Sequence, residues 1–472
     1  MKKLVSGRNL FTTIAILIML TGIVIGAVYI IPGLFREAVF LDFEHDRFRI
    51  EERIAELEEL AADDLEAEFT ADDLEAELAA AKKELDEINA QAMRVREEIS
   101  QPRSIGVALL VAGFALGSFL LAVGNRSQLI IPLLALNLLV FFNIFRDVSF
   151  FAMETMVNYM GYTILSGNFY NIIQRSTELV VLAMGMTFVI SATKGADISV
   201  GATAAIAGAV FIRLMLTYEL TLPYMILAFC AAAVVAVVFV GGFNGTLVSV
   251  FKIQPMVATL IMFTTGRAIA YWINGGSTPT IFNHQWLEYF GRFLPGVPFH
   301  TPIITAVVCG SVIFLILKFT NLGLYTQSVG INEKAARLNG INPVIVKYTA
   351  FIILGVCVTV AAATSVGRIG LMNHETILFG VELDAILAVA IGGNSLGGGK
   401  FKIAGSVMGA YVIFGLNETL LNMGVSSTVI QAYKAVVIIL LVILGSPVVQ
   451  EKASRLWGVM RAKLTAPVQR EV

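Results

Sequence analysis

Lys194-Gly-Ala-Asp-Ile-Ser-Val-Gly201 and Gly330-Ile-Asn-Glu-Lys-Ala-Ala-Arg-Leu-Asn-Gly340 are two short polar segments that interrupt long apolar runs. The first segment, which we call the elbow, is typical of a turn between two membrane spans. The second predicts a compact, charged turn of helix that projects from the membrane. The apolar runs decide the fold, and the two polar segments mark places where the chain turns.

The composition places the chain in a membrane. Of 472 residues, 57% are hydrophobic and only 14% are charged. A soluble protein this apolar has too few polar side chains to cover its surface. Because about 20 apolar residues cross a bilayer, we predict an all-α polytopic fold of about twelve transmembrane helices. These spans lie near residues 10–32, 104–124, 127–145, 177–193, 198–216, 221–241, 254–273, 300–319, 344–366, 377–393, 403–421 and 427–446.

Charge is distributed unevenly along the chain. Residues 33–103 hold 22 acidic and 9 basic side chains, whereas the whole chain holds 35 and 33. Basic residues collect in short cytoplasmic loops. We therefore predict a multi-pass protein of the bacterial cytoplasmic membrane with both termini in the cytoplasm. The first run lacks a small-residue cleavage site, which indicates a retained anchor.

The acidic segment predicts a helical hairpin outside the cytoplasm. Apolar residues recur at alternating spacings of four and three along 50–61 and 74–99, the pattern of a coiled coil. Both ends lead to spans that enter the same membrane face, so the chain must fold back, within Ala61–Ala71. We predict an antiparallel coiled coil over about 41–101. It is either a solvated or self-associating spacer or a docking post for a solute-binding protein, and its acidity argues against nucleic acid or anionic lipid.

Three domains follow from these patterns. Residues 1–126 form two membrane helices that carry the hairpin. Residues 127–446 form a core of about ten membrane helices, and residues 447–472 form a basic cytoplasmic tail.

The core resembles a known family on the elbow, on residues 330–340, on Glu382-Leu-Asp-Ala-Ile386 and on Gly392-Gly-Asn-Ser-Leu-Gly-Gly-Gly399. These segments are similar to the membrane permease subunit of ribose/galactose-type ATP-binding-cassette importers. The family commonly has Gly where this chain has Lys194. The resemblance implies import of a sugar, with an ATPase subunit, an extracytoplasmic sugar-binding protein and a second permease copy or homologous permease as partners.

The same resemblance implies that residues 330–342 are the coupling helix, which sits in a groove of the ATPase subunit. Its charged side chains offer polar contacts, its small ones keep it thin, and the terminal glycines permit sharp reversals. The predicted coupling residues are Gly330, Asn332, Glu333, Lys334, Ala335, Ala336, Arg337, Leu338 and Gly340.

Polar residues in the elbow and in one span are further candidates. The elbow residues are Gly195, Asp197, Ser199 and Gly201. Asp197 and Ser199 are expected either to cap the next helix or to contact the sugar. Arg267 lies inside a span, where an ionisable side chain needs a partner or water. It therefore either lines the transport pathway or holds a neighbouring helix.

The remaining pathway candidates are carboxylates and amides near the carboxyl-terminal spans. Glu382 and Asp384 precede an apolar run, where carboxylates are favoured by a helix amino terminus. They either orient that helix or contact substrate. Asn417 and Gln431 either line the pathway or form hydrogen bonds between helices.

The sequence predicts neither catalysis nor a metal site, because the four His residues are scattered and the three Cys residues lie in apolar runs. The glycines of residues 392–399 predict a tight turn. Residues 392–400 lack the Walker spacing, so we expect ATP to be bound by a partner subunit and no cofactor by this chain. The prediction is a transport subunit without its own ATPase site. The alternatives are a nucleoside-importing permease of the same class and a secondary transporter. The second is disfavoured because we find no acidic residue at the centre of a predicted span.

Overall fold

The computed structural model describes residues 14–22, 24, 46–47, 49–55, 57–58, 71–124, 129–151, 154–157, 163–217, 222–280, 289–292 and 300–445. Contacts divide the chain into two compact units. The first comprises residues 1–125, 140–171 and 294–300, and the second comprises residues 126–139, 172–293 and 301–472. The predicted hairpin turn, most of the first predicted span and the predicted tail at 447–472 lie outside the described residues.

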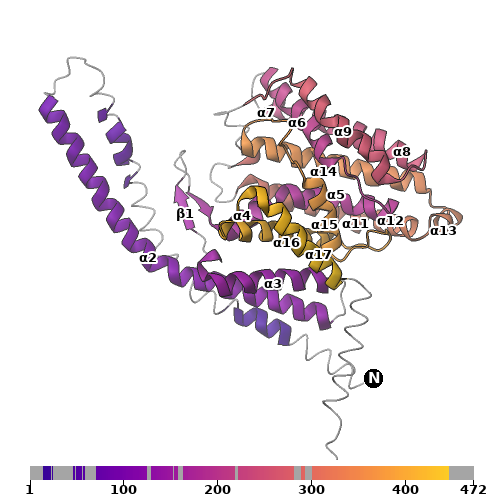
Figure 1. The fold of residues 1–472 in the computed structure, drawn as a ribbon, viewed down its shortest axis with the longest axis horizontal. Helices are drawn as coiled ribbons and strands as arrows, with labels where there is room; N and C mark the ends of the chain where they lie inside the picture. Colours follow the sequence, from indigo (N-terminus) through magenta and orange to yellow (C-terminus); the bar gives the residue numbers. More distant parts are fainter. Residues whose placement is uncertain are drawn as a thin grey trace, which may run out of the picture. The chain divides into compact units, whose positions relative to one another are not determined.

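A single long helix, α2 (Ala71–Gly124), dominates the first unit (Figure 1). The sequence predicts a hairpin arm that ends near residue 101 and a separate span over 104–124. The structure instead shows one continuous helix of 54 residues, which is about 80 Å at 1.5 Å per residue. Its apolar part, Ser104–Val123, is long enough to cross a membrane. The arm therefore rises from the span without a break.

Small residues join α2 to the first membrane helix. Residues 14–22 are helical, and Gly22 lies so close to Gly113 that an added Cβ would be 2.9 Å from the Gly113 Cα atom. Gly117 similarly approaches the carbonyl of Ala15, which is fully buried. Such close backbone packing is typical of membrane helix pairs, where small residues replace the hydrophobic effect as the basis of association.

The two arms of the predicted hairpin contact each other. Residues 49–55 and 57–58 are helical. Lys82 of α2 forms an ion pair with Glu58 at 2.8 Å, and Arg53 forms another with Glu77 at 2.5 Å. The coiled-coil packing stays a prediction, because the turn between the arms is not among the described residues.

A small β-hairpin follows η1 (Val148–Phe151) in the first unit and was not predicted. Its strands are β1 (Glu154–Val157) and β2 (Thr163–Ser166), which pair antiparallel with Glu154 opposite Ser166. The strands have four residues each, and neither alternates polar and apolar side chains, which is the pattern that predicts a half-buried strand. Apart from one isolated bridge between Thr280 and Leu371, the regular structure in the rest of the described chain is helical, so the prediction of an all-α polytopic fold is confirmed apart from the β1–β2 pair.

The remaining described helices lie between residues 130 and 445. In chain order they are α3 (Ile130–Arg146), α4 (Asn168–Arg175), α5 (Thr177–Thr193), α6 (Val200–Thr217), α7 (Leu222–Ala236), the π-helix η2 (Val237–Asn244), α8 (Gly245–Ser249), α9 (Pro255–Ile273), α11 (Thr301–Phe319), α12 (Leu322–Ile331), α13 (Glu333–Leu338), α14 (Pro343–Ile369), α15 (Val381–Ile391), α16 (Ile403–Asn422) and α17 (Ser427–Gly445).

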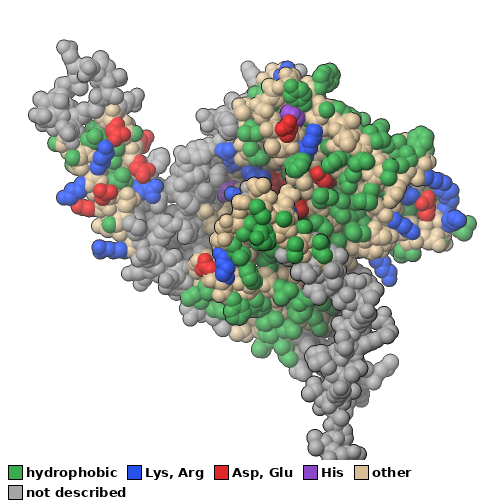
Figure 2. Space-filling view, in the orientation of Figure 1, with side chains coloured by type: hydrophobic (Ala, Val, Ile, Leu, Met, Phe, Trp, Pro, Cys, Tyr) green, Lys and Arg blue, Asp and Glu red, His purple; other side chains and the backbone are tan. Residues whose placement is uncertain are grey.

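Helix α5 is the centre of the second unit. All its residues from Thr177 to Ala192 are buried, and Gly185 packs against Cys357 and Leu354 of α14. A helix that is apolar on every face is one that other helices surround. Outer helices instead expose large apolar side chains, such as Trp272 and Phe319, and Figure 2 shows hydrophobic side chains over much of the visible face. This exposed apolar surface fits a lipid environment.

Seven described helices are long and apolar enough to cross a membrane, and the bent pair α4–α5 makes an eighth. The predicted span at 377–393 is wrong, because α15 has only 11 residues, about 16 Å at the helical rise. Its start is set by Gly380, whose φ of 78° lies in the left-handed region that favours glycine. Helix α15 therefore crosses only part of a bilayer.

Candidate functional site

The predicted coupling segment folds as a short helix with a side-chain cap at its start. Asn332 is extended (φ −151°) and accepts a hydrogen bond from the Ala335 N–H at 3.1 Å, which satisfies a free donor of α13. Gly340 ends the segment with φ 80°, and Asn342 caps α14 by accepting from the Val344 N–H at 3.0 Å. Local side chains thus define both turns of the α12–α13–α14 connection.

Gly330 has a different role from the predicted one. It lies inside α12, and the reversal occurs at Asn332 instead. An added Cβ would be 1.9 Å from the Ser191 carbonyl oxygen and 2.6 Å from the Gly399 nitrogen. Glycine is required here because three backbone segments approach too closely for any side chain.

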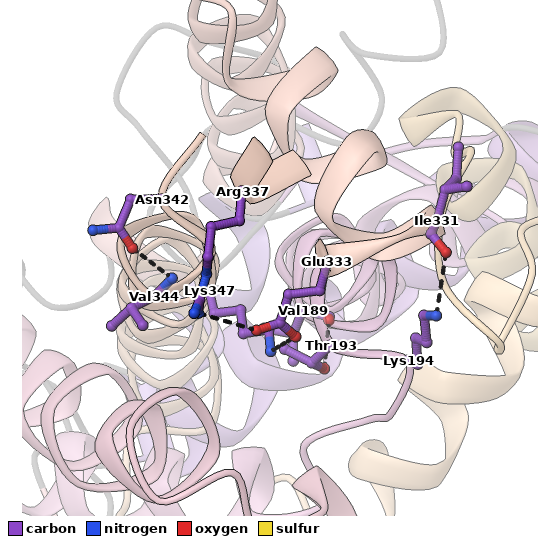
Figure 3. Close-up of polar contacts among 9 residues, drawn as sticks. All are labelled: Val189, Thr193, Lys194, Ile331, Glu333, Arg337, Asn342, Val344 and Lys347. Carbon is purple, nitrogen blue, oxygen red and sulfur yellow. Dashed lines mark hydrogen bonds and ion pairs between the residues drawn. The ribbon is translucent and has the colours of Figure 1, made fainter. Parts of the chain in front are cut away.

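Charges hold α13 against α14. Lys347 of α14 donates to the Glu333 carboxylate at 2.8 Å, and Arg337 lies 3.9 Å from the same carboxylate (Figure 3). The Lys347 hydrogen bond is the main reason why the pKa of Glu333 lies below its ordinary value. Glu333 is therefore a brace within the protein rather than a free contact for a partner.

The outer face of α13 remains open. Ala336 is buried against Val329 and Val346, whereas Leu338 is 89% exposed and Arg337 and Lys334 are exposed beside it. Lys and Arg side chains gather at the end of the molecule where Figure 1 places α13 (Figure 2). This braced helix therefore offers a partner an exposed leucine and, beside it, an arginine, a residue type that is enriched at interfaces.

The polar side chains in the middle of the elbow lie inside the protein, whereas Lys194 at its start is exposed. Asp197 and Ser199 are fully buried. The Asp197 carboxylate accepts from the Ser199 N–H (2.7 Å) and hydroxyl (2.6 Å), and the Asn244 amide donates to Asp197 (3.2 Å) and to Ser199 (2.9 Å). Asp197 therefore accepts the N–H of Ser199, the residue that directly precedes α6. Asn244 ends the π-helix η2, a type of helix that is frequent at functional sites.

The two elbow glycines serve close packing. An added Cβ at Gly195 would lie 3.0 Å from the Pro255 ring at the start of α9, and one at Gly201 would lie 2.4 Å from Oε2 of Glu382. The elbow thus brings the start of α6 against α9 and the start of α15.

Arg267 acts as a structural clamp. Its Nη1 donates to the carbonyl oxygens of His374 (2.7 Å), Glu375 (3.0 Å) and Ile377 (3.2 Å), and its guanidinium lies 5.4 Å from the Phe379 ring centroid. Of the two predicted roles, these contacts favour the structural one, with backbone carbonyls about a hundred residues away as the partners.

The two carboxylates of α15 have different surroundings. Glu382 is 4% exposed, and its Oε2 atom makes no hydrogen bond to a described residue. Asp384 forms an ion pair with Lys434 of α17 at 2.8 Å. The sequence argued against a secondary transporter because no acidic residue lies at the centre of a predicted span. Glu382 is a buried acidic residue, so this argument does not exclude a secondary transporter.

Within the described part of the chain, neither Asn417 nor Gln431 forms a hydrogen bond with Arg267, Glu382 or Asp384. Asn417 is half-buried, and its Oδ1 atom has no hydrogen-bond partner among the described residues. Gln431 is exposed and faces Gly380.

Sequence reasoning missed two ion pairs. Glu178 of α5 pairs with Arg368 of α14 at 2.9 Å, and Lys434 completes the pair with Asp384. The available signal was a basic residue within or at the end of an apolar run, which predicts a nearby carboxylate.

The glycine-rich segment at 392–399 forms a tight turn, as predicted. Gly393, Gly398 and Gly399 have φ values of 77°, 81° and 94°. Asn394 closes the turn by accepting from the Lys402 N–H at 2.7 Å and donating to the Ser406 hydroxyl at 2.8 Å.

These features define the class of protein, a polytopic helical membrane protein. A family model described as "Branched-chain amino acid transport system / permease component" matches residues 168–445. Because this match covers more than half of the chain, the protein belongs to that family of permease components.

Relatives named for sugars share this core. The galactofuranose transporter permease protein of Escherichia coli is 39% identical over 286 residues, which cover 60% of this chain and 80% of that protein. The fructose import permease protein of Bifidobacterium longum is 34% identical over 290 residues, 60% of this chain and 78% of that protein. The ribose import permease protein of Escherichia coli is 36% identical over 284 residues, 59% of this chain and 85% of that protein. No solved structure matches the chain. The predicted resemblance to sugar permeases is confirmed.

Proposed function

We propose that the chain is the membrane permease subunit of an ATP-driven importer of a monosaccharide. A separate ATPase subunit docks on α13, an extracytoplasmic binding protein delivers the sugar, and a second permease copy or a homologous permease completes the pathway. The observation that carries the proposal is the exposed Leu338 on a helix that is braced to α14 by Glu333 and Lys347. The sugar names of the relatives support the substrate class.

The brace gives the docking element a mechanical role. Glu333 fixes α13 to α14, and Asn332 fixes the start of α13, so a force applied at Leu338 moves the connected helices instead of bending a loop. ATP binding can switch the permease only if the ATPase favours one permease state over the other. A rigid contact is one way to supply that difference.

Uptake into proteoliposomes tests the proposal. The purified chain is reconstituted with its co-purifying subunits, and uptake of galactose, fructose and ribose is measured with ATP inside, with and without ionophores that collapse ion gradients. We expect ATP-dependent uptake of at least one sugar that ionophores leave unchanged. Uptake that needs an ion gradient and no ATP would identify a secondary transporter instead.

We also propose that both termini and α13 face the cytoplasm and that the hairpin at 41–101 faces outward, because its acidic charge opposes the basic loops of the core. Glu84→Cys and Lys334→Cys, both at exposed positions, test this orientation in a background without the native cysteines. A membrane-impermeant maleimide should label residue 84 in intact spheroplasts and residue 334 only after permeabilisation. The reverse pattern would invert the topology.

A further inference from the structure

Lys194, at the end of α5, has a backbone conformation that lysine rarely adopts. Its φ of 59° and ψ of 30° are left-handed, and its N–H donates to the Ile190 carbonyl to end the helix. Glycine occupies such positions without steric cost, whereas an L side chain is strained there. A strained non-glycine residue is a reason to examine what its side chain does.

The Lys194 side chain reaches the junction between α12 and α13. Its Nζ donates to the carbonyl oxygen of Ile331 at 3.3 Å (Figure 3). Ile331 is the last residue of α12 and directly precedes Asn332, the residue that caps α13. An ammonium group at the carboxyl end of a helix satisfies a carbonyl and favours the helix dipole.

Backbone segments from three parts of the chain contact one another beside this hydrogen bond. The Gly399 N–H donates to the Ser191 carbonyl at 3.0 Å, and the Ser191 hydroxyl donates to the Gly399 carbonyl. Gly330 packs on the same Ser191 carbonyl, and Gly398 packs on the Lys194 side chain. The end of α5, the turn at 392–399 and the end of α12 therefore meet at one point, where Lys194 supplies a side-chain link from α5 to the α12–α13 junction.

We propose that Lys194 is a positioning residue that ties the α12–α13 junction to the end of α5, so that movement of α13 by the ATPase is transmitted to the centre of the permease. Helix α5 is buried along almost its whole length, so it passes a displacement to the helices packed around it. The inference rests on the proposed function, since it assigns the coupling force to an ATPase docked on α13.

Variants at Lys194 separate this role from simple stabilisation, and Lys252 provides the matched control. Lys252 is also a left-handed, exposed lysine (φ 55°), and its ammonium donates no hydrogen bond to a described residue. Lys194→Met removes the donor, Lys194→Arg retains one, and Lys194→Gly removes both the donor and the backbone strain. The same changes at Lys252 keep every hydrogen bond of the α12–α13 junction, and Lys252→Met and Lys252→Gly remove only a charge interaction with Glu333.

The first measurement is sugar transported per ATP hydrolysed in proteoliposomes, together with the thermal midpoint of the purified chain. For Lys194→Met and Lys194→Gly we expect this ratio to fall about three- to tenfold, the range that the loss of one hydrogen bond supports. Lys194→Arg should restore most of it, and Lys194→Gly should not lower the thermal midpoint. The proposal would be overturned if Lys194→Met kept the wild-type ratio of sugar transported to ATP hydrolysed. It would also be overturned if the ratio fell only in proportion to the amount of folded protein.

A second measurement does not depend on transport. Amide hydrogen exchange of the purified chain should be faster at residues 330–333 in Lys194→Met than in the wild type, and unchanged there in Lys252→Met. Unchanged exchange in Lys194→Met would overturn the tie even if uptake were lost. Conversely, exchange could be faster in Lys194→Met while the wild type shows no ATP-dependent uptake. This result would support the link between Lys194 and the α12–α13 junction but reject the proposed function.

Discussion

Charged side chains serve opposite purposes on α13 and around α15. On α13 they surround an exposed leucine, and Glu333 and Lys347 brace the helix from one side. Around α15 they are partly or fully buried: Arg267 donates to three backbone carbonyls, and Asp384 is joined to α17 through its ion pair with Lys434. The first set shapes a surface for a partner, and the second set fixes the chain on itself.

The difference shows that burial decides whether a charged side chain affects the stability of the fold or the association with a partner. Removing one member of a buried pair leaves the other without compensation, which is strongly destabilising. An exposed charge contributes little to stability and influences association instead. Substitutions around α15 should therefore reduce folded protein, whereas substitutions on α13 should reduce transport by a folded protein.

Arg267→Met should have the largest effect. It leaves the carbonyls of His374, Glu375 and Ile377 without their donor, and we expect a loss of about 3–5 kcal/mol of stability. The measurement is the thermal midpoint and the yield of monodisperse protein in detergent, with Arg213→Met, an exposed arginine of α6, as the control. Normal stability combined with altered sugar selectivity would place Arg267 in the pathway instead.

The Asp384–Lys434 pair comes next. Asp384→Asn and Lys434→Met should each lower stability by about 1–3 kcal/mol, and the double variant should lose less than the sum of the two, because it leaves no unpaired charge. Thermal unfolding of the four proteins in one detergent gives the coupling energy. Strict additivity would show that the ion pair does not link α15 to α17.

Leu338→Ala should leave the fold intact and weaken the ATPase contact. We expect a change in stability within about 0.5 kcal/mol and a loss of association of about tenfold or more, as for a central apolar contact. The assay is co-purification of the ATPase subunit, with Leu227→Ala, 60% exposed on α7, as the control. If both variants lost the same amount of co-purifying ATPase, Leu338 would not be a specific contact for that subunit.

Glu333→Gln should have the smallest effect, and that effect should depend on pH. The Lys347 hydrogen bond lowers the pKa of Glu333 below its ordinary value of 4.5. The charged carboxylate therefore adds stability above pH 4.5, and this contribution is lost as the pH falls through the lowered pKa. The difference in thermal midpoint between wild type and variant should be full at pH 7 and vanish in strong acid. A difference that does not change with pH would mean that the charge of Glu333 is unimportant.

Sequence patterns predicted the features that depend on nearby residues. The Gly340 reversal, the short helix after Asn332 and the 392–399 turn each follow from residues within a few positions of one another. The apolar runs also predicted most membrane helices within a few residues, because length and hydropathy are local properties.

The sequence did not predict contacts between distant residues. Arg267 binds carbonyls 107 to 110 positions away, Lys434 lies 50 positions from Asp384, and Gly330 is required by Ser191 and Gly399. The sequence is therefore compatible with two roles for Arg267. At Gly330 it predicts a reversal, whereas the structure shows close backbone packing. The short α15 was missed because the apolar run extends past Gly380, where the backbone turns.

Photocrosslinking at residue 338 tests the central claim most directly. A benzoyl-phenylalanine replaces Leu338 in native membranes, and the same group at Trp272, which is 80% exposed on α9, serves as the control. The account predicts a crosslink from residue 338 to an ATPase subunit with Walker motifs and no such product from residue 272. An ATPase crosslink from 272 alone, or from neither position while the two proteins co-purify, would contradict α13 as the docking element.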